Sequence, residues 1–334
     1  MSAEALRILL SAAALQSHRA AIDTAMAAAG VPWQAVLVPQ VDEPHTVDAD
    51  VAFVSRDVTG LSTKHEILPA TQRFYTAMLD APSLRWTHTH SAGADRAIFG
   101  QLRQRGVTVT TSSGANAGVV AQTALAGLLA LARHLPQLID AQRESRWAPL
   151  IGSGLPRDLQ GQRATIVGWG PIGKQIGAVL RVLGLAVTVV RQRASPMETG
   201  FQAVTFEQFD AVLPDTDWLI LACPLTDRTR GLVDRAALQR LPAGARLVNV
   251  ARGEVVDEPA LIDALRAERL GGAYLDVFAH EPLAASSPVW SLPNVIATPH
   301  SAGFSDGNAA RVVDIFLDNL RRWSTGETLV NRVE

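Results

Sequence analysis

Three residues in the second half of the chain have types suited to proton transfer on a carboxylic acid. Arg252 follows an apolar strand-like run and precedes Gly253, so its guanidinium can hold a carboxylate through paired hydrogen bonds. His300 also ends such a run, and an imidazole there is a natural proton donor or acceptor near neutral pH. Glu281, in the loop after the preceding run, would favour protonated His300 if the two are in contact.

Each of these three residues could instead have a role unrelated to catalysis. Arg252 could cap a helix or lie on the surface, and Glu281 alone is typical of a loop acid. His300 is one of eight histidines, any one of which is more often structural than catalytic. His280 is its rival, although its neighbour Glu281 is typical of a loop.

A glycine motif precedes these residues. Gly168, Gly170 and Gly173 form G-x-G-x-x-G between the apolar run Ala164–Val167 and an expected helix. A second run, Val187–Val190, follows at the spacing of a strand–helix–strand unit. In that context the glycines allow a tight turn and close approach of a pyrophosphate to the helix N-terminus. We predict a dinucleotide site here, the alternative being a purely structural turn.

Two arginines follow the second run of that unit. An NAD site usually has an acid about 20 residues past the glycines, to hold the ribose 2′-hydroxyl. Between Gly173 and Glu198 the chain has none, and Arg191 and Arg193 stand in its place. Guanidinium groups bind a 2′-phosphate well. The pattern favours NADP(H) over NAD(H), unless both arginines are ordinary surface residues.

The first hundred residues offer one further site. Ser91–Asp95 follows a strand-like run, and its backbone N–H groups could form an anion-binding nest. His88 and His90 share one face of that run and are expected to pack. Cys223 has no base nearby in sequence and is expected to be a small buried residue. Without clusters at ligand spacing we predict no metal site.

The elements that position these residues alternate between β and α. A long apolar helix is expected over 116–139 and another helix over 306–323, with helical pieces over 18–29 and 69–79. This alternation predicts an α/β fold with two doubly wound parallel sheets. The expected strands are 7–10, 34–38, 51–54, 84–88 and 107–110, then 164–168, 187–190, 218–222, 246–250, 273–277 and 295–298.

Length and composition fit two ordinary domains. The chain has 334 residues, a formal charge of −2 and one cysteine. These values give no reason to expect nucleic acid or membrane as a partner, exclude an intrachain disulfide, and fit a reducing, cytoplasmic location. The weakly polar run 115–132 is expected to be a buried helix rather than a membrane span.

The stretch from Gly161 to Gly303 resembles the D-isomer-specific 2-hydroxyacid dehydrogenases. The matching pieces, in order, are VGWGPIG, CPLTDRTRGLVD, VNVARGEVVDEPALIDAL, GAYLDVFAHEPL and NVIATPHSAG. The first hundred residues resemble the family only through strand spacing and the SAGAD loop.

The resemblance implies a role for each candidate residue. Arg252 would bind the carboxylate and the reacting oxygen, Glu281 would keep His300 protonated, and His300 would donate a proton to the keto oxygen. Asp276 would face the nicotinamide amide. Backbone at Ala92 and Gly93 would take the substrate carboxylate. Other cofactor contacts implied by the matched motifs, besides the glycines and arginines above, are Pro171, Ile172, Cys223, Pro224, Thr229, Ala251 and Gly303.

The resemblance also implies two domains around an active-site cleft. A flavodoxin-like substrate domain would comprise 1–114 and 303–334, and a Rossmann-type dinucleotide-binding domain 115–302. The long helix after Asn116 would form the core of a homodimer interface, and Trp147 lies where some relatives extend an aromatic side chain to the partner's pocket. Gln122 and the run 304–306 depart from the family pattern. Glu281 differs from the Gln usual in formate dehydrogenases.

The predicted function is reduction of small 2-ketoacids, of the glyoxylate or hydroxypyruvate type, to D-2-hydroxyacids with NADPH. NAD(H) is the alternative cofactor. The two arginines make the chain most similar to NADPH-dependent glyoxylate/hydroxypyruvate reductases. The alternatives are oxidation of phosphite or another 2-hydroxyacid by the same residues, and a non-enzymatic protein that senses the dinucleotide. Turnover with any small 2-ketoacid separates the enzyme from the sensor.

Overall fold

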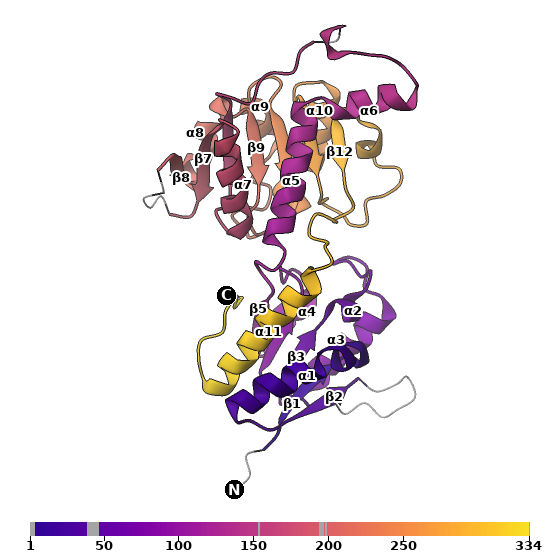
Figure 1. The fold of residues 1–334 in the computed structure, drawn as a ribbon, viewed down its shortest axis with the longest axis vertical. Helices are drawn as coiled ribbons and strands as arrows, with labels where there is room; N and C mark the ends of the chain where they lie inside the picture. The colour runs from indigo at the N-terminus through magenta and orange to yellow at the C-terminus, as the bar shows by residue number, and fades with distance from the viewer. Residues whose placement is uncertain (1–3, 39–46, 153, 194–196, 198, 334) are drawn as a thin grey trace. The chain divides into compact units, whose positions relative to one another are not determined.

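The computed structural model describes residues 4–38, 47–152, 154–193, 197 and 199–333. The chain forms two compact units, Met1–Asn116 with Ser305–Glu334, and Ala117–Phe304. Each unit is a parallel sheet covered by helices (Figure 1), which confirms the predicted α/β fold class. The assignment of substrate binding to the first unit and cofactor binding to the second stays a prediction.

The first unit has a five-stranded sheet in the order β2-β1-β3-β4-β5. This is the 2-1-3-4-5 order of flavodoxin-like folds. Its strands are β1 (Leu6–Leu10), β2 (Trp33–Leu37), β3 (Val51–Val54), β4 (Trp86–Thr89) and β5 (Thr108–Thr111). Its helices are α1 (Ala12–Ala29), α2 (Arg56–Thr59), α3 (Pro69–Asp80), α4 (Ala97–Gln104) and α11 (Asn308–Thr325). Apolar residues of α1 and α11 cover one face of the sheet, and those of α3 and α4 the other.

The second unit has a seven-stranded sheet in the order β12-β11-β10-β9-β6-β7-β8. All its strand pairs are parallel, and the order reverses between β6 and β9, the point where such sheets bind ligands. The strands are β6 (Arg163–Val167), β7 (Ala186–Arg191), β8 (Phe201–Thr205), β9 (Trp218–Leu221), β10 (Arg246–Asn249), β11 (Gly272–Leu275) and β12 (Val295–Ala297). The helices are α5 (Ala117–Ala132), α6 (Leu135–Arg143), α7 (Pro171–Val182), α8 (Phe209–Val212), α9 (Arg235–Arg240) and α10 (Glu258–Arg266). Short 3₁₀ turns are η1 (Leu150–Gly152), η2 (Phe206–Gln208), η3 (Leu213–Asp215), η4 (Gly253–Val255) and η5 (Pro288–Ser291).

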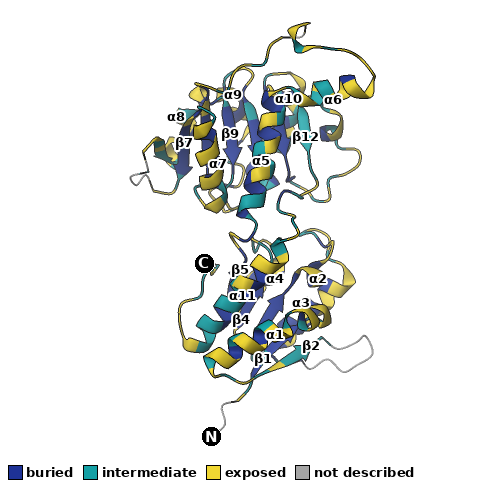
Figure 2. Ribbon diagram, in the orientation of Figure 1, coloured by how far each residue is buried: buried dark blue, intermediate teal, exposed yellow. Residues whose placement is uncertain are grey.

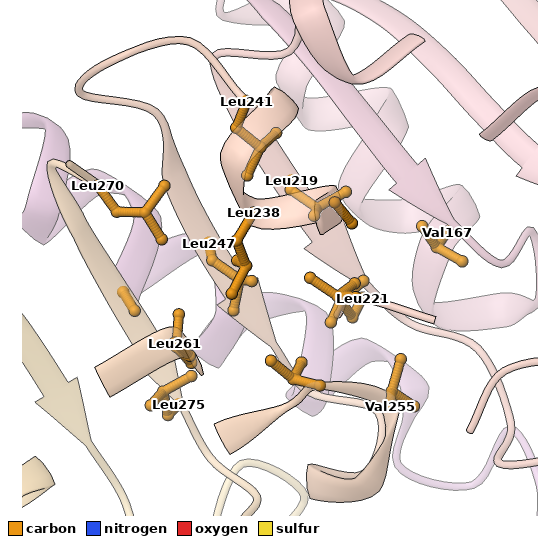
Figure 3. Packing of buried hydrophobic residues seen from close by; sticks show 14 of the residues in the cluster. Val167, Leu219, Leu221, Leu238, Leu241, Leu247, Val255, Leu261, Leu270 and Leu275 are labelled. Carbon is orange, nitrogen blue, oxygen red and sulfur yellow. The ribbon is translucent and has the colours of Figure 1, made fainter. Parts of the chain in front are cut away.

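The core of the second unit lies on both faces of its sheet, whose strands are largely buried (Figure 2). Side chains alternate along β9, with Leu219 and Leu221 on one face and Trp218 and Ile220 on the other. Figure 3 shows the first face, where leucines of the sheet meet Leu238 of α9 and others from neighbouring elements. Helices α5 and α7 cover the second face. Burial on both faces fixes the register of the central strands, and therefore fixes where each strand ends.

Two expectations about the elements were wrong. The helix expected over 116–139 is two helices, α5 and α6, which meet at 73°. His134 between them is left-handed, with φ 55°, and Pro136 in the first turn of α6 has no N–H to continue α5. The edge strand β8 was not among the expected strands.

None of the helices in the described residues is by itself both long and apolar enough to cross a membrane. The bent pair α5 and α6 meets the length and composition test only when taken together.

Candidate active site

His300 and Glu281 form a direct pair. His300 Nδ1 lies 2.8 Å from Glu281 Oε2, and the other carboxylate oxygen accepts a hydrogen bond from the Phe278 N–H at 3.1 Å. The Glu281 side chain is 13% exposed and that of His300 is 49% exposed. A partly buried carboxylate therefore orients the ring through Nδ1, and in the described structure Nε2 has no protein partner. That geometry suits an imidazole that exchanges a proton at Nε2.

The backbone of the loop that carries His300 is held by Asp276. His300 has φ 49°, which a non-glycine residue rarely adopts, and its N–H donates to the Asp276 carbonyl at 2.8 Å. The Asp276 carboxylate, in a residue 3% exposed, accepts from Thr298 Oγ1 at 2.6 Å, Ser301 N at 2.8 Å and Ala302 N at 3.0 Å. These bonds fix the turn on both sides of His300 and compensate its backbone strain.

Tyr274 closes this network from β11. Its hydroxyl lies 2.8 Å from Thr298 Oγ1. Burial, with the nearby charge of Asp276, raises the pKa of Tyr274 to about 12, although the bond to Thr298 opposes the shift. Tyr274 is therefore neutral at physiological pH and acts here as a hydrogen-bonding group.

Arg252 lies at the end of β10 and is positioned by a buried asparagine. Asn249 Oδ1 accepts from the Ala251 N–H, and its Nδ2 donates to the Arg252 carbonyl, each at 3.0 Å. The Arg252 guanidinium donates to the Ala251 carbonyl at 2.7 Å. Next in sequence, a Cβ on Gly253 would lie 1.8 Å from the carbonyl carbon of Phe278. Only glycine allows this packing, which places the Arg252 loop directly against the loop of Glu281.

The glycine motif forms an open cradle at the sheet's reversal point. Gly168 has φ 99°, and a Cβ there would lie 2.6 Å from the Ala222 carbonyl oxygen. Gly173 packs on the carbonyl of Gly168, whereas a Cβ on Gly170 would meet nothing within 4 Å. Pro171 and Ile172 begin α7, and its N-cap, Gly170, has no side chain to satisfy the first N–H groups. The residues present therefore fit a bound pyrophosphate.

The two arginines lie at the end of β7 and just beyond it. Arg191 is its last residue, is half-buried, and donates to Met197 Sδ at 3.1 Å. Arg193 is exposed two residues on.

The remaining candidates of the second unit lie in turns near the carboxyl ends of the strands. Cys223 is buried beside Gly168, and burial raises the pKa of its thiol to about 12, so it remains a thiol. Thr229 is buried, and its hydroxyl donates to the Pro224 carbonyl at 2.7 Å, which closes the turn after β9. Ala251 is buried and Gly303 half-buried.

The first unit offers two backbone donors at the carboxyl end of β4. Ser91 Oγ donates to the Gly93 carbonyl at 2.7 Å, and the Ser91 carbonyl accepts from Ser112 N at 3.0 Å. Within the described ranges no protein acceptor takes the N–H groups of Ala92 and Gly93, so they are available to an anion. His88 of β4 is buried, and burial lowers its pKa to about 3, consistent with the packing role expected of it.

No group of three or more His, Cys, Asp or Glu side chains placed to hold a metal occurs in the part of the chain that the structure describes.

Comparison with known proteins identifies the family of this chain. Residues 125–302 match the model of the D-isomer specific 2-hydroxyacid dehydrogenase, NAD binding domain. The chain is 32% identical to a glyoxylate reductase of Korarchaeum cryptofilum over 76% of this chain and 77% of that one. It is 32% identical to glyoxylate/hydroxypyruvate reductase B of Pectobacterium carotovorum, over 88% and 93%. The chain belongs to the D-isomer-specific 2-hydroxyacid dehydrogenases. It is therefore an NAD(P)-dependent oxidoreductase that acts on the CH–OH group of its donors.

Among solved structures, this dehydrogenase is similar to one from Xanthobacter autotrophicus Py2, with a TM-score of 0.76 and 30% identity. The match covers 99% of this chain and 98% of that one, which was solved with NADPH and MES. The fold therefore agrees over both units.

Two buried polar residues of the dehydrogenase, Asn249 and Asp276, have positioning roles that were not predicted from the sequence. For Asn249, within the VNVARG motif, the available signal was a polar residue at the end of an apolar strand. Asp276 was expected to face the nicotinamide amide, which stays a prediction. In the structure, the Asp276 carboxylate accepts hydrogen bonds from the turn around His300.

The role of Asp276 can be tested by substitution. In the variant Asp276→Ala the turn loses its acceptor, so we expect kcat to fall at least about tenfold because His300 is misplaced. Asp276→Asn, which keeps one acceptor oxygen, should recover part of kcat. Asp263→Ala, which removes an exposed carboxylate from α10, is the control. A loss confined to NADPH affinity, with kcat unchanged, would instead assign Asp276 to the cofactor.

Proposed function

We propose that this dehydrogenase reduces glyoxylate, hydroxypyruvate and similar small 2-ketoacids to D-2-hydroxyacids, with a preference for NADPH. The observation that carries the proposal is the His300–Glu281 pair, together with the packing of the Glu281 loop against that of Arg252. The pair supplies a proton donor with a free His300 Nε2, and Arg252 supplies a guanidinium suited to a carboxylate or a developing alkoxide.

Each residue has a separate role in the proposed reaction. Arg252 binds the carboxylate and orients the keto group. When bound, the reduced nicotinamide supplies the hydride. His300 Nε2 gives a proton to the keto oxygen, so the C=O bond becomes CH–OH and the charges balance. Glu281 holds Nδ1 and stabilises the imidazolium before that transfer.

Initial rates of NADPH oxidation test the proposal. Glyoxylate, hydroxypyruvate, pyruvate and a bulky aromatic 2-ketoacid should differ in kcat/KM, with the first two highest. No turnover of any of the four would contradict the proposed function. Phosphite oxidation and dinucleotide sensing would then be the functions to test.

The preference for NADPH rests on Arg191 and Arg193. The wild-type enzyme should have a kcat/KM for NADPH at least about tenfold above that for NADH, because a 2′-phosphate gains charge-assisted bonds. The double variant Arg191→Ser/Arg193→Ser should lose this ratio mainly by a rise in the KM for NADPH. Arg240→Ser, which changes an exposed arginine paired with Asp210, is the control. Equal rates with both cofactors in the wild type would mean that the two arginines are surface residues.

We further propose that two chains associate through the second unit. Large apolar side chains are exposed in succession after α5, at Leu135, Ile139, Trp147, Ile151 and Leu155. Trp147 is 96% exposed, a costly arrangement for an isolated chain. Sedimentation velocity should give a particle of two 35.6 kDa chains. A monomer at micromolar concentration would contradict the association.

A further inference from the structure

A carboxylate at the start of α10 binds the loop that carries Glu281. Glu258, the first residue of that helix, is half-buried, and its Oε2 accepts a hydrogen bond from the Ala279 N–H at 2.9 Å. Ala279 follows Phe278, whose N–H donates to Glu281 Oε1. Two successive amides of this loop therefore have carboxylates as their acceptors, one from within the loop and one from α10.

Glu258 lies on the same short segment as Arg252, and Val233 holds that segment in place. The Val233 N–H donates to the Val255 carbonyl, and the Val233 carbonyl accepts from Asp257 N, each at 3.0 Å. Val233 and Val255 are both fully buried. Because buried backbone bonded in this way opens rarely, the backbone that carries both residues is fixed relative to the sheet.

The Glu281 loop meets this segment at two points. A Cβ on Gly253 would lie 2.2 Å from Ala279 N, so the loop backbone rests directly on that glycine. Glu258 accepts the hydrogen bond from the same nitrogen. The packing at Gly253 limits how near the loop can come, and the bond to Glu258 prevents it from moving away. Together the two contacts set the position of Glu281 relative to the Arg252 segment.

The ordinary role for an acid at this position would be to stabilise its own helix. A carboxylate in the first turn interacts favourably with the helix dipole. However, α10 already has a capping side chain, since Asp257 Oδ1 accepts from Ala260 N at 3.0 Å. Glu258 instead binds an amide 21 residues away in the chain. This bond indicates a role in the Glu281 loop.

We propose that Glu258 is a positioning residue, which holds the Glu281 loop so that the Glu281 carboxylate meets His300 Nδ1. The inference rests on the proposed function, because its effect on rate requires His300 as the proton donor. Without the bond, the loop relaxes away from the segment and the imidazolium loses part of its stabilisation by Glu281. Reduction needs protonated His300, so the fall of kcat/KM at alkaline pH should then begin at lower pH.

Substitution of Glu258 leaves every other titratable group of this network in place. A shift in the pH profile therefore reports the change at Glu258 alone. The other charged or titratable side chains on the loops and strand that carry the network are Arg252, Glu254, Asp257, Tyr274, Asp276 and His280.

Alanine and glutamine at position 258 separate the hydrogen bond from the charge. Glu258→Ala removes both, whereas Glu258→Gln keeps an acceptor oxygen for Ala279 N without the charge. For Glu258→Ala we expect kcat for hydroxypyruvate to fall at least about threefold and the alkaline limb of kcat/KM to move down by at least about half a pH unit. Glu258→Gln should keep the wild-type limb and most of kcat. Asp263→Ala, which removes an exposed carboxylate from α10, should match the wild type.

An NMR titration of His300 makes the same comparison without substrate. With isotopically labelled histidine, the His300 signals are assigned by their absence from His300→Ala. The titration midpoint should be lower in Glu258→Ala than in the wild type, and Glu258→Gln should restore it.

An unchanged midpoint and alkaline limb in Glu258→Ala would overturn the inference. An equal shift in Glu258→Gln or in Asp263→Ala would overturn it too, because the effect would then be one of charge alone. If the wild type reduces hydroxypyruvate and Glu258→Ala matches it, the proposed function stands while the role of Glu258 fails. If the wild type reduces no 2-ketoacid, the proposed function fails, and the NMR midpoint alone decides the role of Glu258.

Discussion

Replacing His300 by alanine should lower kcat/KM for hydroxypyruvate reduction by about 10²- to 10⁴-fold, the usual contribution of a positioned acid. The variant loses the imidazole that lies 2.8 Å from Glu281 Oε2, and water would have to protonate the keto oxygen. Since the imidazole is half-exposed, its removal leaves little buried space, and folding should be nearly unaffected. Steady-state rates with saturating NADPH, with circular dichroism as the folding check, measure the effect.

The neighbouring histidine provides the matched control. His280 is exposed and adjoins Glu281 in sequence, so His280→Ala makes the same chemical change in the same region. It should keep activity close to that of the wild type. Near-wild-type turnover in His300→Ala, or an equal loss in His280→Ala, would reject His300 as the acid.

Replacing Arg252 by alanine should lower kcat/KM at least about 10²-fold. The substrate loses a charge-assisted partner, and the developing alkoxide loses its electrostatic stabilisation. We expect KM to rise and kcat to fall together, because the guanidinium contacts both the carboxylate and the reacting oxygen in the proposed mechanism. Lysine should recover only part of the activity, since an ammonium cannot form the same paired bonds.

Arg266 supplies the control for this substitution. It is exposed in the last turn of α10, away from the loops of Arg252 and Glu281 in sequence, and Arg266→Ala should be close to wild type. If Arg252→Ala changed neither KM nor kcat, the guanidinium would be no more than part of the turn that Asn249 holds.

The sequence predicted the fold class because the central strands are short apolar runs separated by helical patterns. Burial on both faces makes such runs conspicuous, as in β9, all four of whose residues are buried. The edge strand β8 was missed for the opposite reason. Phe201–Thr205 has no fully buried residue, so its pattern is weak. The break after α5 had a local signal in Pro136, which the continuous apolar composition outweighed.

In the candidate site, too, some residues could be predicted from local motifs, whereas the contacts between residues far apart in the chain could not. The glycines and Arg252 lie in local motifs whose chemistry can be predicted from the sequence. The contact of His300 with Glu281 joins residues 19 apart, and the clamp of Asp276 on 298–302 spans more than 20. These contacts depend on the register of β11 against β12, which only the folded sheet provides.

Transfer of deuterium from the cofactor to the product tests whether this enzyme delivers hydride to C2 of a 2-ketoacid. The enzyme would be given NADPH deuterated at both C4 positions together with hydroxypyruvate, and the glycerate formed would be analysed for chirality and isotope. We expect D-glycerate that carries deuterium at C2, in the same amount as the NADPH consumed. Loss of NADPH without deuterium at C2, or formation of L-glycerate, would contradict it.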